Sequence, residues 1–448
     1  MKRLVYFLLV FVFSTNITGK IFSQQYCIPG RFDTTYYFNA LQIDTLGNVQ
    51  FGQNTDWLGS TINLKFIIAY PKISVDPLNK RPFILLIHGG GFIDGDKYDM
   101  KPVMLDFAMR GYVCASIDYR LGWQTNGDPT NCLGDGYSLA KANYRAYQDS
   151  KAALRYFAAN ANTYKIDTAY FFVGGISAGA VTSLMISYAN QQDINSVYPS
   201  LVTELGSLDS ASNTLTNRFT IKCALSSSGG VFDSAFVKAN TKIPAIMFHG
   251  TLDPEVPFNT GFAYSCTNYV RTEGSNELKK RFLHLVKPFE IDYVPGGGHE
   301  NYYPLPYVQY RSILFLKRYL CNNARQIIIE NYTTLFDSSL GAFNGVIARN
   351  ESVPAEYRLY QNYPNPFNPI TIIRYQIKDS RFVTLKVYDI LGREIETLVK
   401  ELQNAGTYEA QFTENQISSG VYFYYLEVTE PGSQKLLFKD VKRMLLIK

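Results

Sequence analysis

Short apolar runs alternate with helical patterns from about residue 60 to residue 320. Each run has the length of a strand, and the segments between them, such as 101–111 and 147–164, repeat apolar residues at helical spacing. This alternation predicts an α/β fold with a mainly parallel sheet. The predicted strands are INLKFIIAY (62–70), FILLIH (83–88), YVCASIDY (112–119), AYFFVGG (169–175), IKCALS (221–226), AIMFHG (245–250) and FEIDYV (289–294).

The pattern changes twice. Residues 187–218 are polar and small, which predicts an insertion over one face of the α/β domain. From Thr371 onward only alternating strands and turn signals remain, which predicts a small all-β, immunoglobulin-like sandwich of roughly ninety residues. We therefore expect an α/β domain over 24–325, a linker over 326–356 and a β-sandwich over 357–448, with few contacts across the boundary.

The N-terminal segment has the character of a secretory signal peptide over residues 1–23. Lys2 and Arg3 precede an apolar run from Leu4 to Phe13, which is too short to span a membrane. Cleavage is expected near Ser23, and no later run reaches spanning length, so no stable membrane span is expected. The net charge of +5 over 448 residues, without a Lys/Arg stripe, gives no case for nucleic acid.

Export would place the six cysteines in an oxidising compartment. Cys114 and Cys223 lie in strand patterns and are expected to be core thiols. The remaining four are candidates for disulfides whose pairing the sequence leaves open: Cys27, Cys132, Cys266 and Cys321. None of the spacings resembles a zinc site, so no metal is expected.

A G-x-S-x-G motif lies between a predicted strand and a predicted helix, at Gly175–Gly179. In that context the glycines allow a sharp turn, which lifts the hydroxyl of Ser177 clear of the backbone at the positive end of the helix. Upstream, three glycines follow His88 at the end of another strand. An acyl-transfer enzyme stabilises an oxyanion with preorganised N–H groups, and we expect these donors from Gly90, Gly91 and Ala178.

A nucleophilic serine needs a base, and the base needs an orienting acid, in the chain order Ser, Asp or Glu, His. His299 lies on a glycine-rich loop after the last predicted strand and is the expected base, ahead of His284. In HGTLDPEVPF, Asp253 is favoured over Glu255 as the acid, because it comes first and precedes a proline. His249 is expected only to hold the turn that follows it. Four aromatic residues are candidates for a pocket lining, with ordinary packing as the alternative: Trp123, Tyr137, Tyr302 and Tyr303.

These motifs resemble those of the α/β-hydrolase superfamily, specifically carboxylesterases of the HGGGF/GxSAG type, with hormone-sensitive-lipase-like esterases as the nearest large group. The resemblance covers about residues 60–320 and rests on HGGGF, IDYRLG, GISAGA, HGTLDPEVP and GGGHE. It implies Ser177 as nucleophile, Asp253 as acid and His299 as base. The acid motif is closer to that of dienelactone-hydrolase-like or feruloyl-esterase-like enzymes, and the long N-terminal helical cap is lacking, which leaves the acyl preference open.

The last ninety residues resemble the C-terminal sorting domain of the type IX secretion system of Bacteroidetes-like bacteria. The resemblance rests on NYPNPFNP (362–369), VYDILGREI (387–395), SGVYFYYLE (419–427) and KRMLLIK (442–448). It implies the type IX machinery as a partner and export through the periplasm and across the outer membrane, to the cell surface or the medium.

The expected function is that of a secreted serine carboxylesterase that acts through an acyl-enzyme, without a cofactor. Its expected substrates are short-chain or aromatic-acid esters, with polysaccharide-linked esters as one form. Two alternatives stay open. One is a serine peptidase of the prolyl-oligopeptidase type, although the chain has no room for the usual large β-propeller. The other is a non-catalytic adhesion protein with a hydrolase fold, although such proteins usually lack one of the three catalytic residues.

Overall fold

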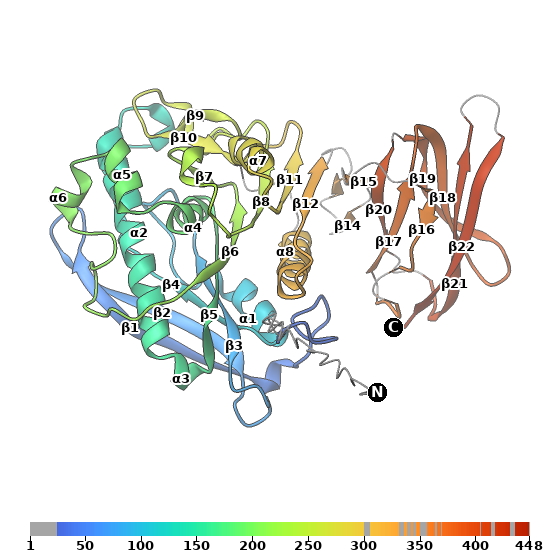
Figure 1. Ribbon diagram of the computed structural model, residues 1–448, viewed down its shortest axis with the longest axis horizontal. Coiled ribbons are helices and arrows are strands. Elements are labelled where there is room, and N and C mark those ends of the chain that lie inside the picture. The colour runs from blue at the N-terminus through green and yellow to red at the C-terminus, as the bar shows by residue number, and fades with distance from the viewer. Residues whose placement is uncertain are drawn as a thin grey trace, which may run out of the picture.

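The computed structural model describes residues 25–299, 305–330, 336–337, 342–343, 346–349, 356–362, 365–368, 370–403, 405–413, 417–430 and 435–447. The expected signal peptide, Tyr302 and Tyr303 lie outside these residues. Figure 1 shows an α/β part, coloured blue to light orange, and a β-sandwich, coloured dark orange to red.

A mainly parallel sheet forms the centre of the α/β part. Its strands are β1 (Ile43–Thr55), β2 (Thr61–Pro71), β3 (Arg81–Ile87), β4 (Val113–Ile117), β5 (Ile166–Ile176), β6 (Ile221–Ser227), β8 (Ala245–Gly250), β11 (Phe289–Val294) and β12 (Gln326–Glu330). They lie in the order β1-β2-β4-β3-β5-β6-β8-β11-β12. β2 is antiparallel to β1 and β4, and the strands from β4 to β12 are parallel. This is the α/β-hydrolase arrangement, so the predicted fold class is confirmed.

Helices cover both faces of this sheet. The α-helices are α1 (Lys101–Met109), α2 (Gly136–Ala159), α3 (Ala161–Tyr164), α4 (Ala178–Tyr188), α5 (Gln191–Val197), α6 (Leu201–Leu205), α7 (Ser275–His284) and α8 (Leu305–Leu320). Short 3₁₀ turns are η1 (Ala40–Gln42), η2 (Pro129–Asn131), η3 (Ser234–Phe236) and η4 (Ala263–Ser265). None of the helices in the described part of the chain has the length and apolar character that crossing a membrane requires.

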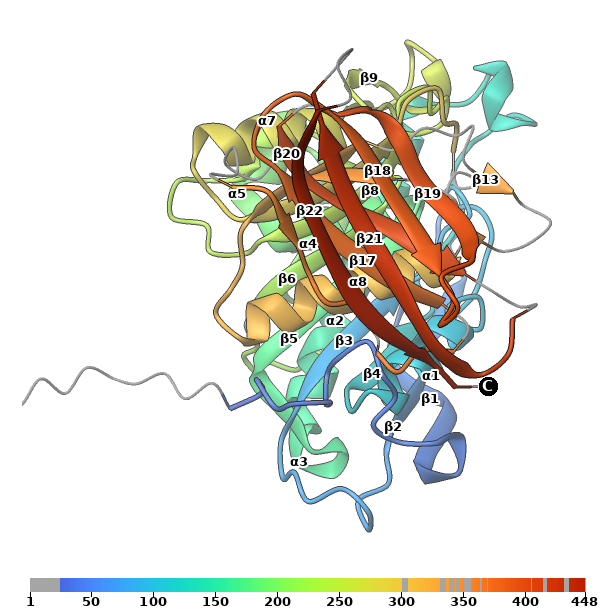
Figure 2. The same cartoon turned by 90° about the vertical axis from the view of Figure 1, so that its right-hand side faces the viewer.

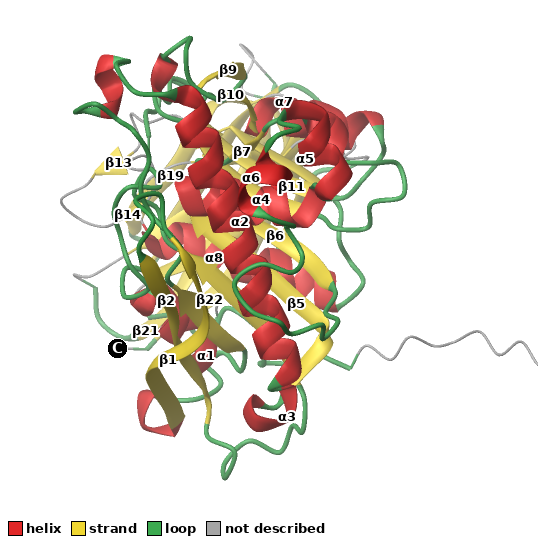
Figure 3. Ribbon diagram, turned by 90° about the vertical axis from the view of Figure 1, so that its left-hand side faces the viewer, coloured by secondary structure: helices red, strands yellow, loops and turns green. Residues whose placement is uncertain are grey.

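Alternation along the strands divides the core into two layers. In β3, Phe83 and Leu85 pack in the cluster that contains α2, α4 and α7, whereas Ile84 and Leu86 pack in the cluster that contains α1 and α8. Successive side chains of a strand point to opposite faces, so a strand that is covered on both faces is apolar throughout. Figure 3 shows α2 and α4 on one face of the sheet.

The structure corrects the predicted elements in three places. β1 is absent from the prediction because its sequence, IDTLGNVQFGQNT, is that of a largely exposed edge strand without an apolar run. α2 begins at Gly136 rather than near Tyr147, and the Asp135 side chain caps it by accepting the N–H of Ser138. The polar insertion contains α5 and α6, and a small sheet β7-β10-β9 (Gly230–Val231, Arg271–Gly274, Thr260–Phe262) lies beyond it.

The β-sandwich consists of two antiparallel sheets. One contains β16 (Arg358–Leu359), β17 (Ile370–Ile377) and β20 (Gly406–Thr413), and the other has the order β19-β18-β21-β22 (Glu394–Gln403, Arg381–Tyr388, Gly420–Thr429, Leu436–Leu446). Alternate residues of these strands, such as Val383, Leu385 and Val387, fill a separate core. Figure 2 shows the sandwich in front of the α/β part. The predicted all-β unit is confirmed.

The boundary between the two parts differs from the prediction. β12 lies in the expected linker, yet it pairs in parallel with β11, and buried Ile327 and Ile329 belong to the α/β core. Short strands occupy the rest of that segment: β13 (Phe336–Asp337), β14 (Ala342–Phe343) and β15 (Val346–Arg349). β15 pairs with both β12 and β20, so hydrogen bonds continue across the boundary. An unpaired β12 edge would leave its backbone groups without partners, which is the physical reason for this pairing.

A buried ion pair also crosses the boundary. Arg311 Nη1 of α8 lies 3.2 Å from Glu409 Oε2 of β20, and Arg311 also pairs with Glu290 of β11. A buried guanidinium needs carboxylate partners, and one of them comes from the sandwich. This ion pair and the pairings of β15 link the α/β part to the sandwich.

The cysteines form two disulfides. Cys27 pairs with Cys321, which ties the N-terminal segment to the end of α8, and Cys132 pairs with Cys266. Cys114 and Cys223 are free and buried, as predicted. The pairing depends on the fold, because the partners are separated by 294 and 134 residues in the sequence.

Candidate active site

The turn after β5 places Ser177 at the start of α4 with φ 53° and ψ −121°. A left-handed φ is strained for a non-glycine residue and persists only where the surroundings enforce it. The flanking glycines allow this close packing. A Cβ on Gly175 would lie 2.4 Å from the carbonyl carbon of Gly179, and a Cβ on Gly179 would lie 2.0 Å from the Ile87 carbonyl oxygen. Any larger residue at either position would push the strand and the helix apart.

Three of the predicted side chains meet at the carboxyl edge of the sheet. Ser177 follows β5, Asp253 follows β8 and His299 follows β11, and these parallel strands end at the same edge. His299 Nε2 lies 2.8 Å from Ser177 Oγ, and His299 Nδ1 lies 2.7 Å from Asp253 Oδ2. His284 is exposed at the end of α7.

The environment of Asp253 keeps its carboxylate ionised. Its Oδ1 accepts the backbone N–H groups of Glu255 and Val256, each at 2.9 Å. Burial would raise the pKa of Asp253, but hydrogen bonds from His249 and His299 outweigh this effect and hold the pKa well below its usual range. The ionised carboxylate of Asp253 accepts a hydrogen bond from Nδ1–H of His299, so that Nε2 carries no proton and can accept the hydrogen bond of the Ser177 hydroxyl.

Glu255, the alternative acid, occupies a different place. Its Oε2 lies 3.5 Å from Nε2 of His299, the nitrogen that faces Ser177, and its side chain is 38% exposed. An orienting acid has to hold the opposite nitrogen, Nδ1, and Asp253 does so from a fully buried position.

His249 contributes more to this arrangement than its predicted role in the turn. It is fully buried, and its Nε2–H donates to the Val256 carbonyl at 2.9 Å while lying 3.2 Å from Asp253 Oδ2. Its Nδ1 lies 2.8 Å from the hydroxyl of Ser275 at the start of α7. His249 therefore holds both the turn and the carboxylate of Asp253. The only sequence signal for this contact is a histidine at the end of an apolar strand, four residues before the predicted acid.

The glycine loop after β3 is held through its carbonyl groups. The Gly89 carbonyl accepts the hydroxyl of Tyr119 at 3.1 Å, the Gly90 carbonyl accepts the Ile93 N–H at 2.9 Å, and the Gly91 carbonyl accepts the indole N–H of Trp123 at 3.0 Å. Trp123 was a candidate for a pocket lining, and the structure instead shows it buried beneath the loop.

The residues expected to supply the oxyanion donors line the two cavities that contain Ser177. Within the described residues, no protein acceptor for the N–H groups of Gly90, Gly91 or Ala178 is present. Gly91 and Ala178 line one cavity with Ser177, and Gly90 and Gly91 line a second. Fixed carbonyls and unengaged N–H groups next to a nucleophile are what oxyanion binding requires.

Two cavities meet at Ser177. The first, which we call the inner pocket, is lined by Gly91, Phe92, Leu139, Asn143, Ser177, Ala178, Val181, Glu255, Val256, Ala263, Tyr264, Val270 and Thr272. The second, the outer groove, is more open and is lined by Gly90, Gly91, Ile93, Asp94, Asp128, Pro129, Thr130, Ser177, Glu255, Tyr264 and His299. The sequence did not indicate Tyr264 as a pocket residue, because it lies in a loop without an apolar pattern. Tyr137, a predicted lining candidate, instead donates its hydroxyl to Glu204.

Comparison with known proteins assigns both parts of the chain. The family model described as BD-FAE matches residues 72–229, which include the glycine loop and Ser177 and end before Asp253 and His299. The model of the secretion system C-terminal sorting domain matches residues 361–439.

Individual proteins resemble the chain more distantly. Methylphloroacetophenone synthase of Cladonia uncialis is 41% identical over 76 residues, which make up 16% of this chain and 3% of that protein. Among solved structures, esterase 2 of Thermogutta terrifontis phosphorylated by paraoxon is 16% identical, with 64% of this chain and 96% of that chain covered at a TM-score of 0.43. Esterase B of Lactobacillus Rhamnosis is 14% identical, with 63% and 86% covered at a TM-score of 0.40.

The sheet order and the turn at Ser177 define an α/β-hydrolase. Residues 72–229 match the BD-FAE family, which is an esterase family, and this match supports carboxylesterase activity. Its sorting domain marks it for export by type IX secretion to the cell surface or outside the cell. The family match favours this activity over the peptidase and adhesion alternatives.

Proposed function

We propose that the protein hydrolyses short-chain or aromatic-acid esters, including esters carried by polysaccharides, through a covalent acyl-serine. Ser177 is the nucleophile, His299 the base and Asp253 the orienting acid. The observation that carries this proposal is the continuous hydrogen-bonded chain from Ser177 Oγ through both ring nitrogens of His299 to Asp253 Oδ2, at 2.8 and 2.7 Å.

Acylation follows from this geometry. His299 Nε2 takes the proton of Ser177 as Oγ attacks the ester carbonyl carbon, and Asp253 stabilises the imidazolium that forms. The carbonyl oxygen becomes negative and is bound by the N–H groups of Gly90, Gly91 and Ala178. His299 then gives its proton to the leaving alcohol, which departs as the acyl-serine forms.

Deacylation repeats these roles with water. His299 removes a proton from a water molecule as the water attacks the acyl carbonyl, and the same N–H groups bind the second oxyanion. Collapse of this intermediate returns the proton to Ser177 Oγ and releases the carboxylic acid. The proposed mechanism uses no cofactor.

The position of His299 supports a proposal for which part of the ester each cavity binds. A base that protonates the leaving alcohol must face it, and His299 lines the outer groove but is absent from the described lining of the inner pocket. The alcohol part therefore occupies the outer groove, and the acyl part occupies the inner pocket.

The linings support the proposed substrate class. Apolar side chains such as Leu139, Val181 and Val270 line the inner pocket, which suits a short aliphatic or aromatic acyl group. The outer groove has the polar side chains of Asp128 and Thr130 and is open to solvent. Such a groove suits a hydroxyl-rich alcohol, including a sugar unit of a polymer.

A panel of chromogenic esters that varies the acyl and the alcohol parts separately tests this proposal. We expect kcat/KM to be highest for short aliphatic or aromatic acyl groups and to tolerate large hydrophilic alcohols. A preference for acyl chains beyond about ten carbons would contradict the proposal.

The role of the glycine loop is tested by Gly91→Val. Gly91 has φ 57°, and a Cβ there would lie 2.2 Å from the hydroxyl oxygen of Tyr264, so valine has to displace the loop. We expect turnover to fall by about a hundredfold or more, the scale of losing one oxyanion donor. Gly59→Val is the matched control, because Gly59 also has a positive φ but lies in open space. Thermal unfolding of both variants reports the strain, and a fully active Gly91→Val enzyme would show that the loop only fills a turn.

A further inference from the structure

The inner pocket and the outer groove share few lining residues. Gly91, Ser177, Glu255 and Tyr264 line both. Gly91 and Ser177 belong to the proposed reaction site itself, so the side chains of Glu255 and Tyr264 form the partition between the two cavities. The backbone joins these residues, because the Tyr264 N–H donates to the Glu255 carbonyl at 2.8 Å.

The phenol of Tyr264 spans the space between its own loop and the glycine loop. A Cβ built on Gly91 would lie 2.2 Å from the Tyr264 hydroxyl oxygen, so the tip of the side chain rests against Gly91. The ring also packs edge-on against Tyr269, with ring centroids 6.3 Å apart. A side chain that reaches from one wall to the other closes the inner pocket toward the groove.

The backbone of this loop is held in an uncommon conformation. Tyr264 and Ser265 both have positive φ, 54° and 58°. Consecutive left-handed residues other than glycine persist where neighbouring contacts determine them. The Ser265 hydroxyl donates to the Pro254 carbonyl at 3.1 Å, and the Cys266 N–H donates to the Ala263 carbonyl at 3.0 Å.

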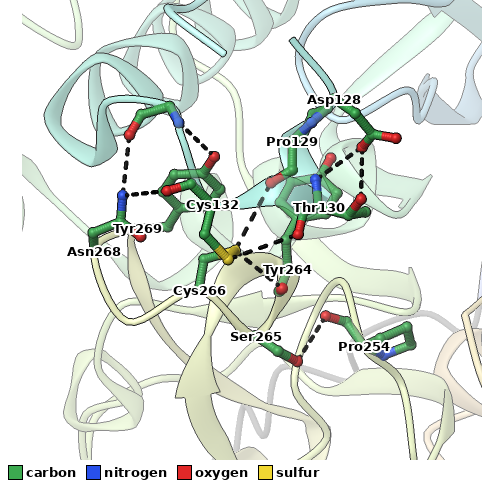
Figure 4. The surroundings of a disulfide bond; sticks show 11 residues. Asp128, Pro129, Thr130, Cys132, Pro254, Tyr264, Ser265, Cys266, Asn268 and Tyr269 are labelled. Carbon is green, nitrogen blue, oxygen red and sulfur yellow. Dashed lines mark hydrogen bonds between the residues drawn. A yellow bond between two sulfur atoms is a disulfide. The ribbon is translucent and has the colours of Figure 1, made fainter. Parts of the chain in front are cut away.

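The Cys132–Cys266 disulfide joins this loop to the loop that contains η2, which supplies the opposite side of the groove. Figure 4 shows the disulfide where the two loops meet, beside Pro129 and Tyr264. Asn268 Nδ2 donates to the Cys132 carbonyl at 3.2 Å and to the Gly134 carbonyl at 3.1 Å. The disulfide is the covalent link between two loops that are 134 residues apart in the sequence.

We propose that the Cys132–Cys266 disulfide fixes Tyr264 as the wall between the two cavities, and that Tyr264 thereby sets the maximum length of the acyl group. The proposal rests on the function proposed above and names the residue that selects its acyl chains. Disulfides form in oxidising compartments and not in the cytosol, so this selectivity is completed after export.

The test compares kcat/KM for p-nitrophenyl butyrate and p-nitrophenyl decanoate. Tyr264→Ala opens the inner pocket into the groove, and we expect the decanoate-to-butyrate ratio to rise by about tenfold or more, through a lower KM for the decanoate. Tyr264→Phe keeps the ring and should keep the wild-type ratio. An unchanged ratio in Tyr264→Ala would overturn the role of Tyr264.

A matched pair of disulfide variants tests whether the Cys132–Cys266 disulfide holds Tyr264 in place. The double variant Cys132→Ser/Cys266→Ser should shift the ratio in the same direction as Tyr264→Ala. The control Cys27→Ser/Cys321→Ser removes the other disulfide, at the end of α8, and should leave the ratio unchanged. Equal shifts in both double variants would overturn the role of the Cys132–Cys266 bond.

Labelling with a fluorophosphonate separates failure of this inference from failure of the proposed function. Stoichiometric labelling of Ser177 shows that a variant has kept a folded and reactive site. If the wild-type enzyme is neither labelled nor hydrolyses either ester, the proposed function is wrong and the inference fails with it. If labelling is intact and the ratios do not respond, only the inference fails.

Discussion

Replacing Ser177 with alanine is expected to lower the turnover of ester hydrolysis by about a millionfold, the scale observed when a nucleophile that acts as one unit with its base is removed. In the proposed mechanism, the hydroxyl of Ser177 is the protein group that forms the covalent bond to the acyl carbon. The measurement is single-variant kinetics with a short-chain chromogenic ester, together with mass spectrometry of the fluorophosphonate-treated protein, in which Ser177 should carry the adduct.

Ser187→Ala is the matched control for this substitution. Ser187 lies in the same helix, α4, and its hydroxyl donates to the Ser183 carbonyl at 2.7 Å. This variant should keep its turnover. Substantial hydrolysis by Ser177→Ala, or an adduct on another residue, would show that the nucleophile lies elsewhere.

His299→Ala should reduce turnover by a similar factor, because without a base the Ser177 hydroxyl stays protonated and unreactive. Asp253→Asn should reduce it somewhat less, by about ten-thousandfold, because an amide favours the wrong tautomer of His299. In that tautomer Nε2 carries the proton and cannot accept one from Ser177. Kinetics and thermal unfolding of each variant separate loss of chemistry from loss of folding.

His284→Ala is the control for the base assignment. His284 is exposed at the end of α7, and its replacement should leave the kinetics unchanged. If His284→Ala were inactive and His299→Ala active, the base would be wrongly assigned. The geometry that argues against this outcome is the 2.8 Å contact between His299 Nε2 and Ser177 Oγ.

The buried strands could be predicted from the sequence because each of them is covered on both faces. A strand such as β3 has to be apolar at every position, which leaves an unmistakable run in the sequence. The strands at the edges of the α/β sheet were not predicted, because they are not covered on both faces by a continuous apolar run. β1 is partly exposed and reads as polar, and β12 is a short run whose burial depends on neighbours on both sides.

The turn at Ser177 could be predicted because its signal is local. Two glycines around a serine, between a strand and a helix, allow the close approach that the structure shows between Gly179 and the Ile87 carbonyl. The positions of Asp253 and His299 followed from chain order, since parallel strands deliver their following loops to the same edge. The contact of His249 with Asp253 has no such local signal, because it depends on how the turn after β8 folds back.

By itself, the sequence determined the apolar pattern of the parallel sheet, the conformation of the turn at Ser177 and the order of the candidate catalytic residues, because each of these depends on neighbouring residues or on strand direction. Only the tertiary structure decided which cysteines pair, which carboxylate holds Nδ1 of His299, and how Tyr264 divides the inner pocket from the outer groove. These features join segments that are 46 to 294 residues apart. Contacts of that kind form when distant loops are brought together by the packed sheet, and no local pattern of residues encodes them.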